Sequence, residues 1–112
     1  PTYTLIKDYA WYTATVIGIT QPVGQKQQNA FALFDMAGNV WEWCEDDYHT
    51  SYTDAPADGS PWVDSPRSTD RVVRGGAKNE QNWGCRLANR LKSANNGYGN
   101  IGFRIAADVT AP

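Results

Sequence analysis

The sequence predicts a loop-rich α+β domain in which short strands are joined by long irregular loops, and three observations lead to this fold class. The chain has 112 residues, which suits one domain at most. Five Trp, six Tyr and three Phe favour a buried core over disorder. Ten Gly and six Pro break the chain into short segments, and no long amphipathic helix is predicted after residue 20.

The first 39 residues contain three candidate elements. Residues 8–13 fit either the end of a helix or an aromatic strand. The β-branched residues at 15–20 predict a strand. Apolar residues 29–34 lead into a turn at 35–39, where Asp, Gly and Asn tolerate unusual backbone angles.

The clearest predicted strand covers residues 40–44. Its alternation places Trp41 and Trp43 on one face and Glu42 on the other. We expect both Trp side chains to lie in the core, because large aromatic groups on one strand face favour burial. Residues 45–70 are acidic and then Pro-rich, and they predict a loop.

The second half of the chain predicts three further strands. The first covers residues 71–74 and is ended by the pair Gly75-Gly76. The others cover residues 85–90 and 101–107, and the Asn- and Gly-rich residues 91–100 between them predict a loop.

The net charge of −2 hides a strong division along the chain. Residues 1–66 hold two Lys and nine acidic residues, a net charge of −7. Residues 67–112 hold eight Lys and Arg and three acidic residues, a net charge of +5. The Arg residues are spaced singly, so we expect them to pair with carboxylates of the same domain rather than with nucleic acid.

The two cysteines, Cys44 and Cys85, do not form a metal-binding motif. They lie far apart in sequence and form no CxxC pair, and with the single His49 they cannot supply four zinc ligands. They form either one disulfide or two buried thiols. We favour an exported or periplasmic location, where a disulfide between them would persist.

Four motifs occur in one order along the chain. They are Gly-Asn-Val-Trp-Glu-Trp at 38–43, Arg-Val-Val-Arg-Gly-Gly at 71–76, Arg-Leu-Ala-Asn-Arg at 86–90 and Gly-Phe-Arg at 102–104. With these motifs, the chain from Tyr9 to Asp108 strongly resembles the formylglycine-generating enzyme family, also called the sulfatase-modifying-factor family. The resemblance implies a C-type-lectin-like fold with a small twisted antiparallel sheet and long irregular loops.

The resemblance covers only part of that family's domain. Residues 1–112 correspond to its C-terminal half, and the N-terminal half has no counterpart in this chain. The chain also opens on Pro1 without Met, so we expect a processed product or a piece of a longer polypeptide. We expect its apolar surface to be covered by a protein partner or by the remainder of its own domain.

The turn at 35–42 is the candidate metal site. Calcium prefers carboxylate and backbone carbonyl oxygens, and the turn has a carboxylate at each end. In the resembled family a calcium ion is held at the matching positions, which here are Asp35, Gly38, Val40 and Glu42. The alternative is that Asp35 caps the turn while Glu42 pairs with an Arg.

Oxidase activity is not expected, because the resembled enzyme uses two active-site cysteines that bind copper. In this chain the matching interval, residues 77–85, contains only Cys85. One thiol cannot form a two-thiolate copper site, so we expect neither copper nor catalytic residues. The formylglycine-generating oxidase remains the alternative function.

We therefore expect a binding or structural module that is stabilised by calcium. A second alternative is a variable ligand-binding protein of a diversity-generating retroelement, a group that also resembles this chain. Most Asn residues lie between 79 and 100, and such side chains provide adaptable contacts on loops. The candidate ligand-binding residues are Lys78, Asn79, Gln81, Asn82, Trp83, Asn95 and Tyr98.

The remaining arginines of the motifs are expected to be structural. Arg86 and Arg90 are four apart and would share one strand face, where they suit bidentate pairing with Glu42 or Asp46. Structural roles are also expected for Arg74 and Arg104. No apolar run approaches the ~20 residues of a membrane span, so none is expected.

Overall fold

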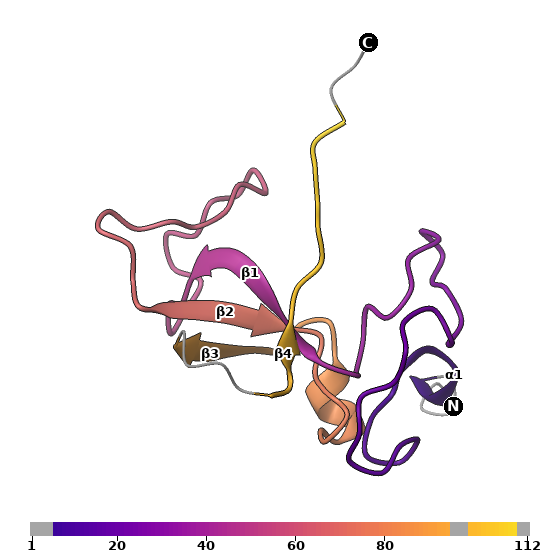
Figure 1. Cartoon of the computed structure of the whole chain (residues 1–112). Helices are drawn as coiled ribbons and strands as arrows, with labels where there is room; N and C mark the ends of the chain where they lie inside the picture. Colours follow the sequence, from indigo (N-terminus) through magenta and orange to yellow (C-terminus); the bar gives the residue numbers. More distant parts are fainter. Residues whose placement is uncertain (1–5, 95–98, 110–112) are drawn as a thin grey trace.

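The computed structural model describes residues 6–94 and 99–109. Its regular elements are short, and most of the described chain follows irregular paths around one small sheet (Figure 1). The helix α1 covers Ile6–Tyr9, and the 3-10 helix η2 covers Asn82–Cys85. No helix in this described part is long and apolar enough to cross a membrane.

The sheet has four strands in the order β3-β2-β1-β4. They are β1 (Trp41–Asp47), β2 (Asp70–Arg74), β3 (Arg90–Ala94) and β4 (Ile101–Gly102). β2 is antiparallel to both β1 and β3, whereas β4 pairs in parallel with the start of β1. The predicted loop-rich α+β class with a small sheet is confirmed, and the parallel edge strand is an addition to it.

The strand predicted at 15–20 is wrong. Thr15 instead closes a turn: its amide donates to the Tyr12 carbonyl at 2.8 Å, and its hydroxyl oxygen accepts from the Tyr12 amide at 2.9 Å. Gly18 then adopts a positive φ of 66°. The hydroxyl of Thr15 competes with strand pairing here, as side chains of this type do in turns.

The second half of the chain also differs from its prediction. Residues 82–85 form η2, and β3 begins only at Arg90, so the predicted strand 85–90 is wrong and the predicted loop 91–100 opens with a strand. The last strand ends at Gly102, because only Trp41 and Glu42 at the start of β1 pair with it. Beyond this point the chain extends away from the sheet (Figure 1).

The core is small and lies on one face of the sheet. Trp41, Val73 and Ala77 are each at most 3% exposed, and Trp43 and Ile101 pack against them. The predicted burial of Trp41 is confirmed, and Trp43 is partly buried against the same cluster. Many other large apolar side chains of the described residues are exposed. They do not contribute the roughly 25 cal/mol per Å² that burial of apolar area provides.

Candidate functional site

The turn before β1 is held in place by backbone contacts from three separate segments. The Gly38 amide donates to the Gly75 carbonyl at 2.7 Å, and the Asn39 amide donates to the Trp11 carbonyl at 2.7 Å. The Asn39 side chain accepts from the Gln21 amide at 2.9 Å and donates to the Gln21 carbonyl at 3.0 Å. Asn39 is only 7% exposed and therefore anchors the turn, a role that the sequence analysis missed.

The tight geometry of this turn depends on left-handed backbone angles. Asp35, Gly38 and Asn39 have φ values of 55°, 77° and 66°. Gly38 tolerates its angle because it lacks a side chain, and Asn and Asp adopt this region more readily than other residues. The turn chemistry predicted for residues 35–39 is confirmed by these angles.

All four residues of the predicted metal site line one cavity of about 450 Å³. Asp35, Gly38, Val40 and Glu42 contribute from the turn and the start of β1. The rest of the lining is mostly apolar and comes, apart from Asn39 of the turn, from three segments, at residues 23–24, 32–34 and 103–104. Its large apolar members are Val23, Leu33, Phe34 and Phe103.

Glu42 is engaged by Arg104, as the alternative to calcium anticipated. Arg104 donates from Nε and Nη2 to the two carboxylate oxygens of Glu42, each at 2.6 Å. It also donates to the carbonyls of Phe34 at 3.0 Å and Asp35 at 2.8 Å. Hydrogen bonding to Glu42 raises the pKa of Arg104 above its ordinary value. The guanidinium thus donates hydrogen bonds to carboxylate and carbonyl oxygens of residues that line the cavity.

The donor set nevertheless has the chemistry that calcium prefers. It consists of the carboxylates of Asp35 and Glu42 and the carbonyls of the turn, all of which are hard oxygen ligands. The Asp35 carboxylate accepts from the Gly24 amide at 2.7 Å, which leaves oxygen lone pairs for a cation. Among the described residues, Arg104 forms an ion pair with Glu42 and would compete with a cation for its carboxylate. The described residues, this turn included, contain no group of three His, Cys, Asp or Glu side chains placed to hold a metal, so the candidate site relies on two carboxylates and backbone carbonyls.

The predicted ligand-binding residues fall into two groups. Lys78, Asn79 and Gln81 precede η2, whereas Asn82 and Trp83 are its first two residues, and Trp83 is 58% exposed. Asn79 accepts from the Asn100 side chain at 3.2 Å. Asn95 and Tyr98 lie outside the described residues. The segment at 78–83 is fixed to the rest of the domain by Thr13, whose amide and hydroxyl both donate to the Glu80 carbonyl.

The predicted pairing of Arg86 and Arg90 with Glu42 or Asp46 is wrong. Arg86 is exposed after η2 and donates to the Trp83 carbonyl, while Arg90 opens β3 and donates to the His49 carbonyl at 2.6 Å. The two residues do not share a strand, because η2 and a turn replace the expected strand 85–90.

Both cysteines are free in the structure. Cys44 is half-buried on β1, and Cys85 is buried at the end of η2. Burial raises the pKa of both thiols, and with the nearby charge of Glu80 it brings that of Cys85 to about 11. Both thiols therefore favour the protonated form near neutral pH when no metal is bound, and the thiolate is the form that acts as a nucleophile or a metal ligand.

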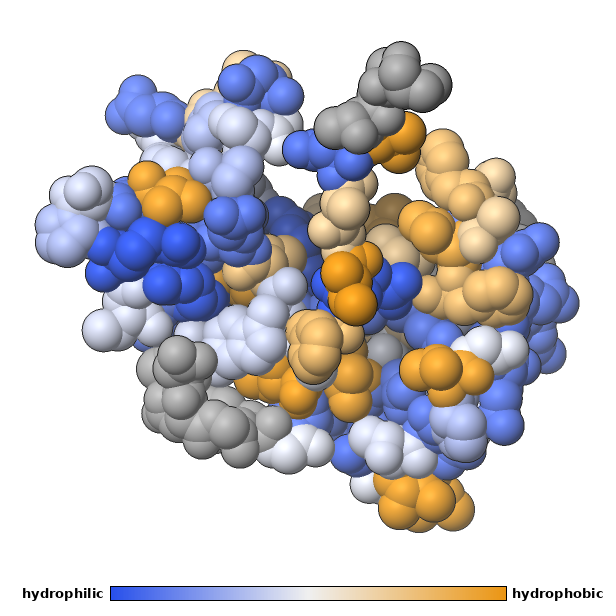
Figure 2. Space-filling model, turned by 45° about the horizontal axis from the view of Figure 1, so that its top comes forward, coloured by the Kyte–Doolittle hydropathy of each residue, from blue (hydrophilic) through white to orange (hydrophobic). Residues whose placement is uncertain are grey.

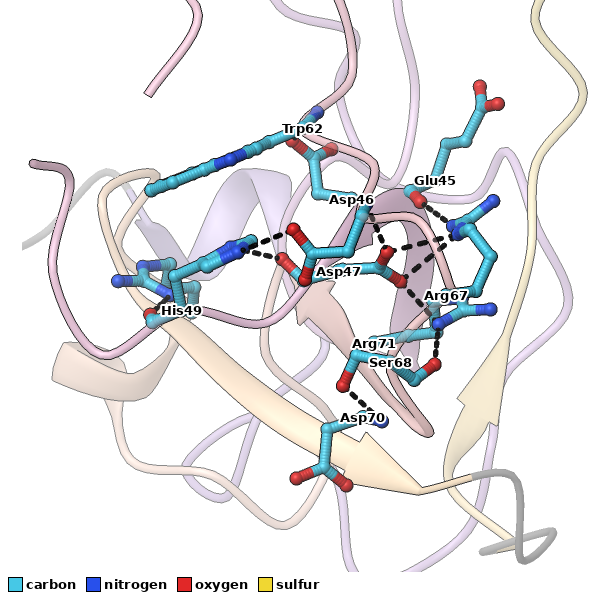
Figure 3. A network of polar contacts seen from close by, with 11 residues as sticks. Glu45, Asp46, Asp47, His49, Trp62, Arg67, Ser68, Asp70 and Arg71 are labelled. Atoms are coloured by element: carbon cyan, nitrogen blue, oxygen red, sulfur yellow. Dashed lines mark hydrogen bonds and ion pairs between the residues drawn. The ribbon is translucent and has the colours of Figure 1, made fainter. Parts of the chain in front are cut away.

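A buried carboxylate, Asp47, organises the loop between β1 and β2 (Figure 3). It is 1% exposed, and it accepts from the Asp64 amide at 2.7 Å and from Arg67 Nε at 3.0 Å. Arg71 donates to its other oxygen. Burial alone would raise the pKa of Asp47, but hydrogen bonds from the Asp64 amide, Arg67 and Ser68 outweigh burial and lower it.

This network was not predicted from the sequence. Asp47 follows two other acidic residues, and nothing in the neighbouring sequence indicates that this one of the three is buried. The expectation that arginines pair with carboxylates of the same domain is met by Arg67, Arg71 and Arg104.

Comparison with protein families gives one match across the chain. The model of the sulfatase-modifying factor enzyme 1-like domain matches residues 2–109. Three curated relatives align with 76–80% of the chain: the serine/threonine-protein kinase pkn1 of Chlamydia caviae at 39% identity, the formylglycine-generating enzyme of Streptomyces coelicolor at 36%, and the inactive C-alpha-formylglycine-generating enzyme 2 of Bos taurus at 31%. The chain spans only 15%, 30% and 25% of their respective lengths.

Two solved structures share the fold over most of the chain. PvdO from Pseudomonas aeruginosa aligns with 87% of the chain at a TM-score of 0.79 and 35% identity. Treponema denticola variable protein 1 aligns with 91% of the chain at a TM-score of 0.73 and 28% identity. The chain spans 38% and 37% of these two proteins. Motif order, turn geometry, fold and family match agree, and the chain belongs to the sulfatase-modifying factor enzyme 1-like family.

Proposed function

We propose that this domain is a non-catalytic binding and structural module, stabilised by one calcium ion at the turn before β1. The observation that carries the proposal is the convergence of Asp35, Gly38, Val40 and Glu42 on one cavity. Two carboxylates and backbone carbonyls suit calcium, and the ion would tie the turn to β1. The proposal that the module is non-catalytic is supported by the raised pKa of Cys85, the single cysteine at 77–85.

Calcium affinity should depend on Glu42 and respond in opposite directions to two substitutions. Glu42→Gln removes a ligand charge and should weaken calcium binding by at least about ten-fold. Arg104→Gln removes the competing guanidinium and should strengthen binding several-fold. Glu45→Gln, on the exposed side of the same strand, is the matched control and should leave the affinity unchanged. Titration calorimetry on the natural polypeptide measures all three, and equal affinities for Glu42→Gln and Glu45→Gln would reject the site.

A protein surface is proposed to cover the apolar rim of the cavity. Val23 and Phe103 are each 79% exposed at this rim, and Ile105 beyond it is 90% exposed. Figure 2 shows apolar surface gathered on the right half of the face it presents. Exposure on this scale is typical of a surface that contacts another protein segment. Because relatives carry much additional chain, that segment is either the remainder of the same domain or a separate partner.

Hydrogen exchange on the natural polypeptide tests this cover. Residues 105–109 are exposed, and no hydrogen bond engages their amides among the described residues. If another segment covers them, their amides should exchange at least about a hundred-fold more slowly than in an unstructured peptide. Unprotected amides throughout 105–109, beside a protected β2, would show that nothing covers this surface.

The oxidase is the second candidate, favoured by 36% identity to the Streptomyces coelicolor enzyme. Against it stand the single cysteine at 77–85 and the raised pKa of Cys85, which disfavours the reactive thiolate when no metal is bound. Incubation with a cysteine-containing sulfatase peptide and copper, followed by mass spectrometry, separates the two functions. The proposed module leaves the cysteine intact, whereas the oxidase converts it to formylglycine.

The variable ligand-binding protein is the third candidate, favoured by the likeness to Treponema denticola variable protein 1. The exposed Trp83 and its polar neighbours at 78–82 would form part of such a surface. Sequencing the same locus in many isolates decides this case. Substitutions concentrated within residues 78–100 would support variability, and uniform sequences there would exclude it.

A further inference from the structure

We propose that Arg74 and Arg90 form a binding site for a single small oxyanion group. The two residues are direct cross-strand partners at the end of β2 and the start of β3. Both line one cavity of about 50 Å³, whose walls include the aromatic side chains of His49, Tyr52 and Trp62. Like charges directly opposite each other in a sheet are destabilising, so this pair favours a negative group between its members.

Arg74 and Arg90 form no ion pair with a carboxylate among the described residues. Glu42 lies opposite Arg74 on β1, but both of its carboxylate oxygens accept from Arg104. Arg67, Arg71 and Arg104 each form an ion pair with Asp47 or Glu42. The pair of Arg74 and Arg90 therefore differs from the structural arginines that the rest of the domain uses.

Neutral groups hold both guanidinium groups in place. Arg74 donates to the Leu87 carbonyl at 3.0 Å and to the Tyr52 hydroxyl at 2.7 Å. The Arg90 guanidinium lies 4.8 Å from the ring centre of Tyr48 and 4.5 Å from that of Tyr52, and it donates to a loop carbonyl. A guanidinium has five N–H donors, so these contacts fix its orientation and leave further donors for a ligand.

Acidic residues also lie near this cavity. Glu42, opposite Arg74 in the sheet, is paired with Arg104. Asp47 lines the cavity, but Arg67 and Arg71 neutralise its carboxylate. Asp64 pairs with His49 at 3.1 Å. Asp46 also lines the cavity, and among the described residues its carboxylate accepts a hydrogen bond from the Trp62 amide at 3.1 Å and forms no ion pair. Asp46 should therefore weaken anion binding.

The size and walls of the cavity limit the ligand. His49 stacks on Trp62 with ring centres 3.6 Å apart and an angle of 9° between the planes, which makes one wall rigid and flat. A volume of about 50 Å³ admits one small group and no larger body. The ligand is accordingly one carboxylate or one tetrahedral oxyanion. The two cavities share no lining residue, although Glu42 of the proposed calcium site lies opposite Arg74 in the sheet.

Titration of the natural polypeptide with acetate and, separately, with sulfate at constant ionic strength tests the site. The readout is the NMR signals of the Arg Nε–H groups. We expect saturable shifts of the Arg74 and Arg90 signals with at least one of the two anions. The tighter anion identifies the geometry of the group that binds. Unchanged or non-saturating signals with both anions would overturn the proposal, and this wild-type experiment needs no variant.

Variants sharpen the test. Arg74→Gln and Arg90→Gln should each weaken the anion by at least about ten-fold, because a charged hydrogen-bond donor is lost. Asp46→Asn should tighten it. Arg86→Gln is the control, since Arg86 is exposed, has no described ion pair and does not line the cavity. Equal affinities for folded Arg74→Gln and Arg86→Gln would contradict the site.

Discussion

Asp47→Asn should lower the unfolding midpoint by about 10 °C or more, because it removes the charge at the centre of the loop network. The substitution keeps the shape of the side chain, yet Arg67 and Arg71 lose their carboxylate partner. Asp54→Asn is the matched control, because Asp54 is exposed on the same loop and has a positive φ that Asn tolerates. Thermal unfolding followed by circular dichroism gives both values.

The pH dependence provides a second test of the same network. The pKa of Asp47 is lowered in the folded state, so the stability it contributes is present above the ordinary Asp value of about 3.9 and is lost as pH falls below it. The difference in midpoint between wild type and Asp47→Asn should therefore shrink as the pH falls below about 4. A difference that is constant from pH 7 to pH 3 would contradict the assigned role of the carboxylate.

Gly38→Ala should be among the most damaging single-methyl additions to this domain. A Cβ at this position would lie 2.2 Å from the Trp11 carbonyl oxygen, and the φ of 77° already disfavours a side chain. Gly18→Ala is the matched control, because Gly18 has a φ of 66° and no atom within 4 Å of the added Cβ.

The Gly18→Ala control separates the cost of the left-handed backbone angle from the cost of the steric clash between the new Cβ and Trp11. Both variants should lose about 1–2 kcal/mol of folding stability through the left-handed angle. Gly38→Ala should lose roughly a further 1–3 kcal/mol, because the Trp11 segment must move away from the turn. Chemical denaturation of both variants measures the difference. Equal losses would mean that the contact between Trp11 and the turn does not hold the site together.

The parts of the fold with strong local signals could be predicted. Trp41 and Trp43 flank Glu42, and this alternation and the Val72-Val73 pair predicted the positions of β1 and β2, although β1 continues to Asp47, into the stretch predicted as loop. β3 could not be predicted, because its sequence is largely polar and its position is set by pairing with β2. Pairing of this kind depends on tertiary context more than on intrinsic preference.

The candidate site shows the same division. The family resemblance singled out Asp35, Gly38, Val40 and Glu42, all of which line one cavity, and turn chemistry predicted the backbone angles at 35–39. The ion pair of Arg104 with Glu42 spans 62 residues and has no local signal, although the alternative of an Arg partner was open. Asp47 was missed for a similar reason, since its partners lie 17 to 24 residues further along the loop. Long-range polar networks are set by the fold, which brings distant segments together.

A crystal structure of the natural polypeptide grown with saturating calcium tests the central claim most directly. The account predicts one calcium ion in the cavity, bound by the carboxylates of Asp35 and Glu42 and by the carbonyls of Gly38 and Val40. It also predicts that Arg104 no longer donates to both oxygens of Glu42. A cavity without a cation, in which Arg104 still engages both Glu42 oxygens, would contradict the account.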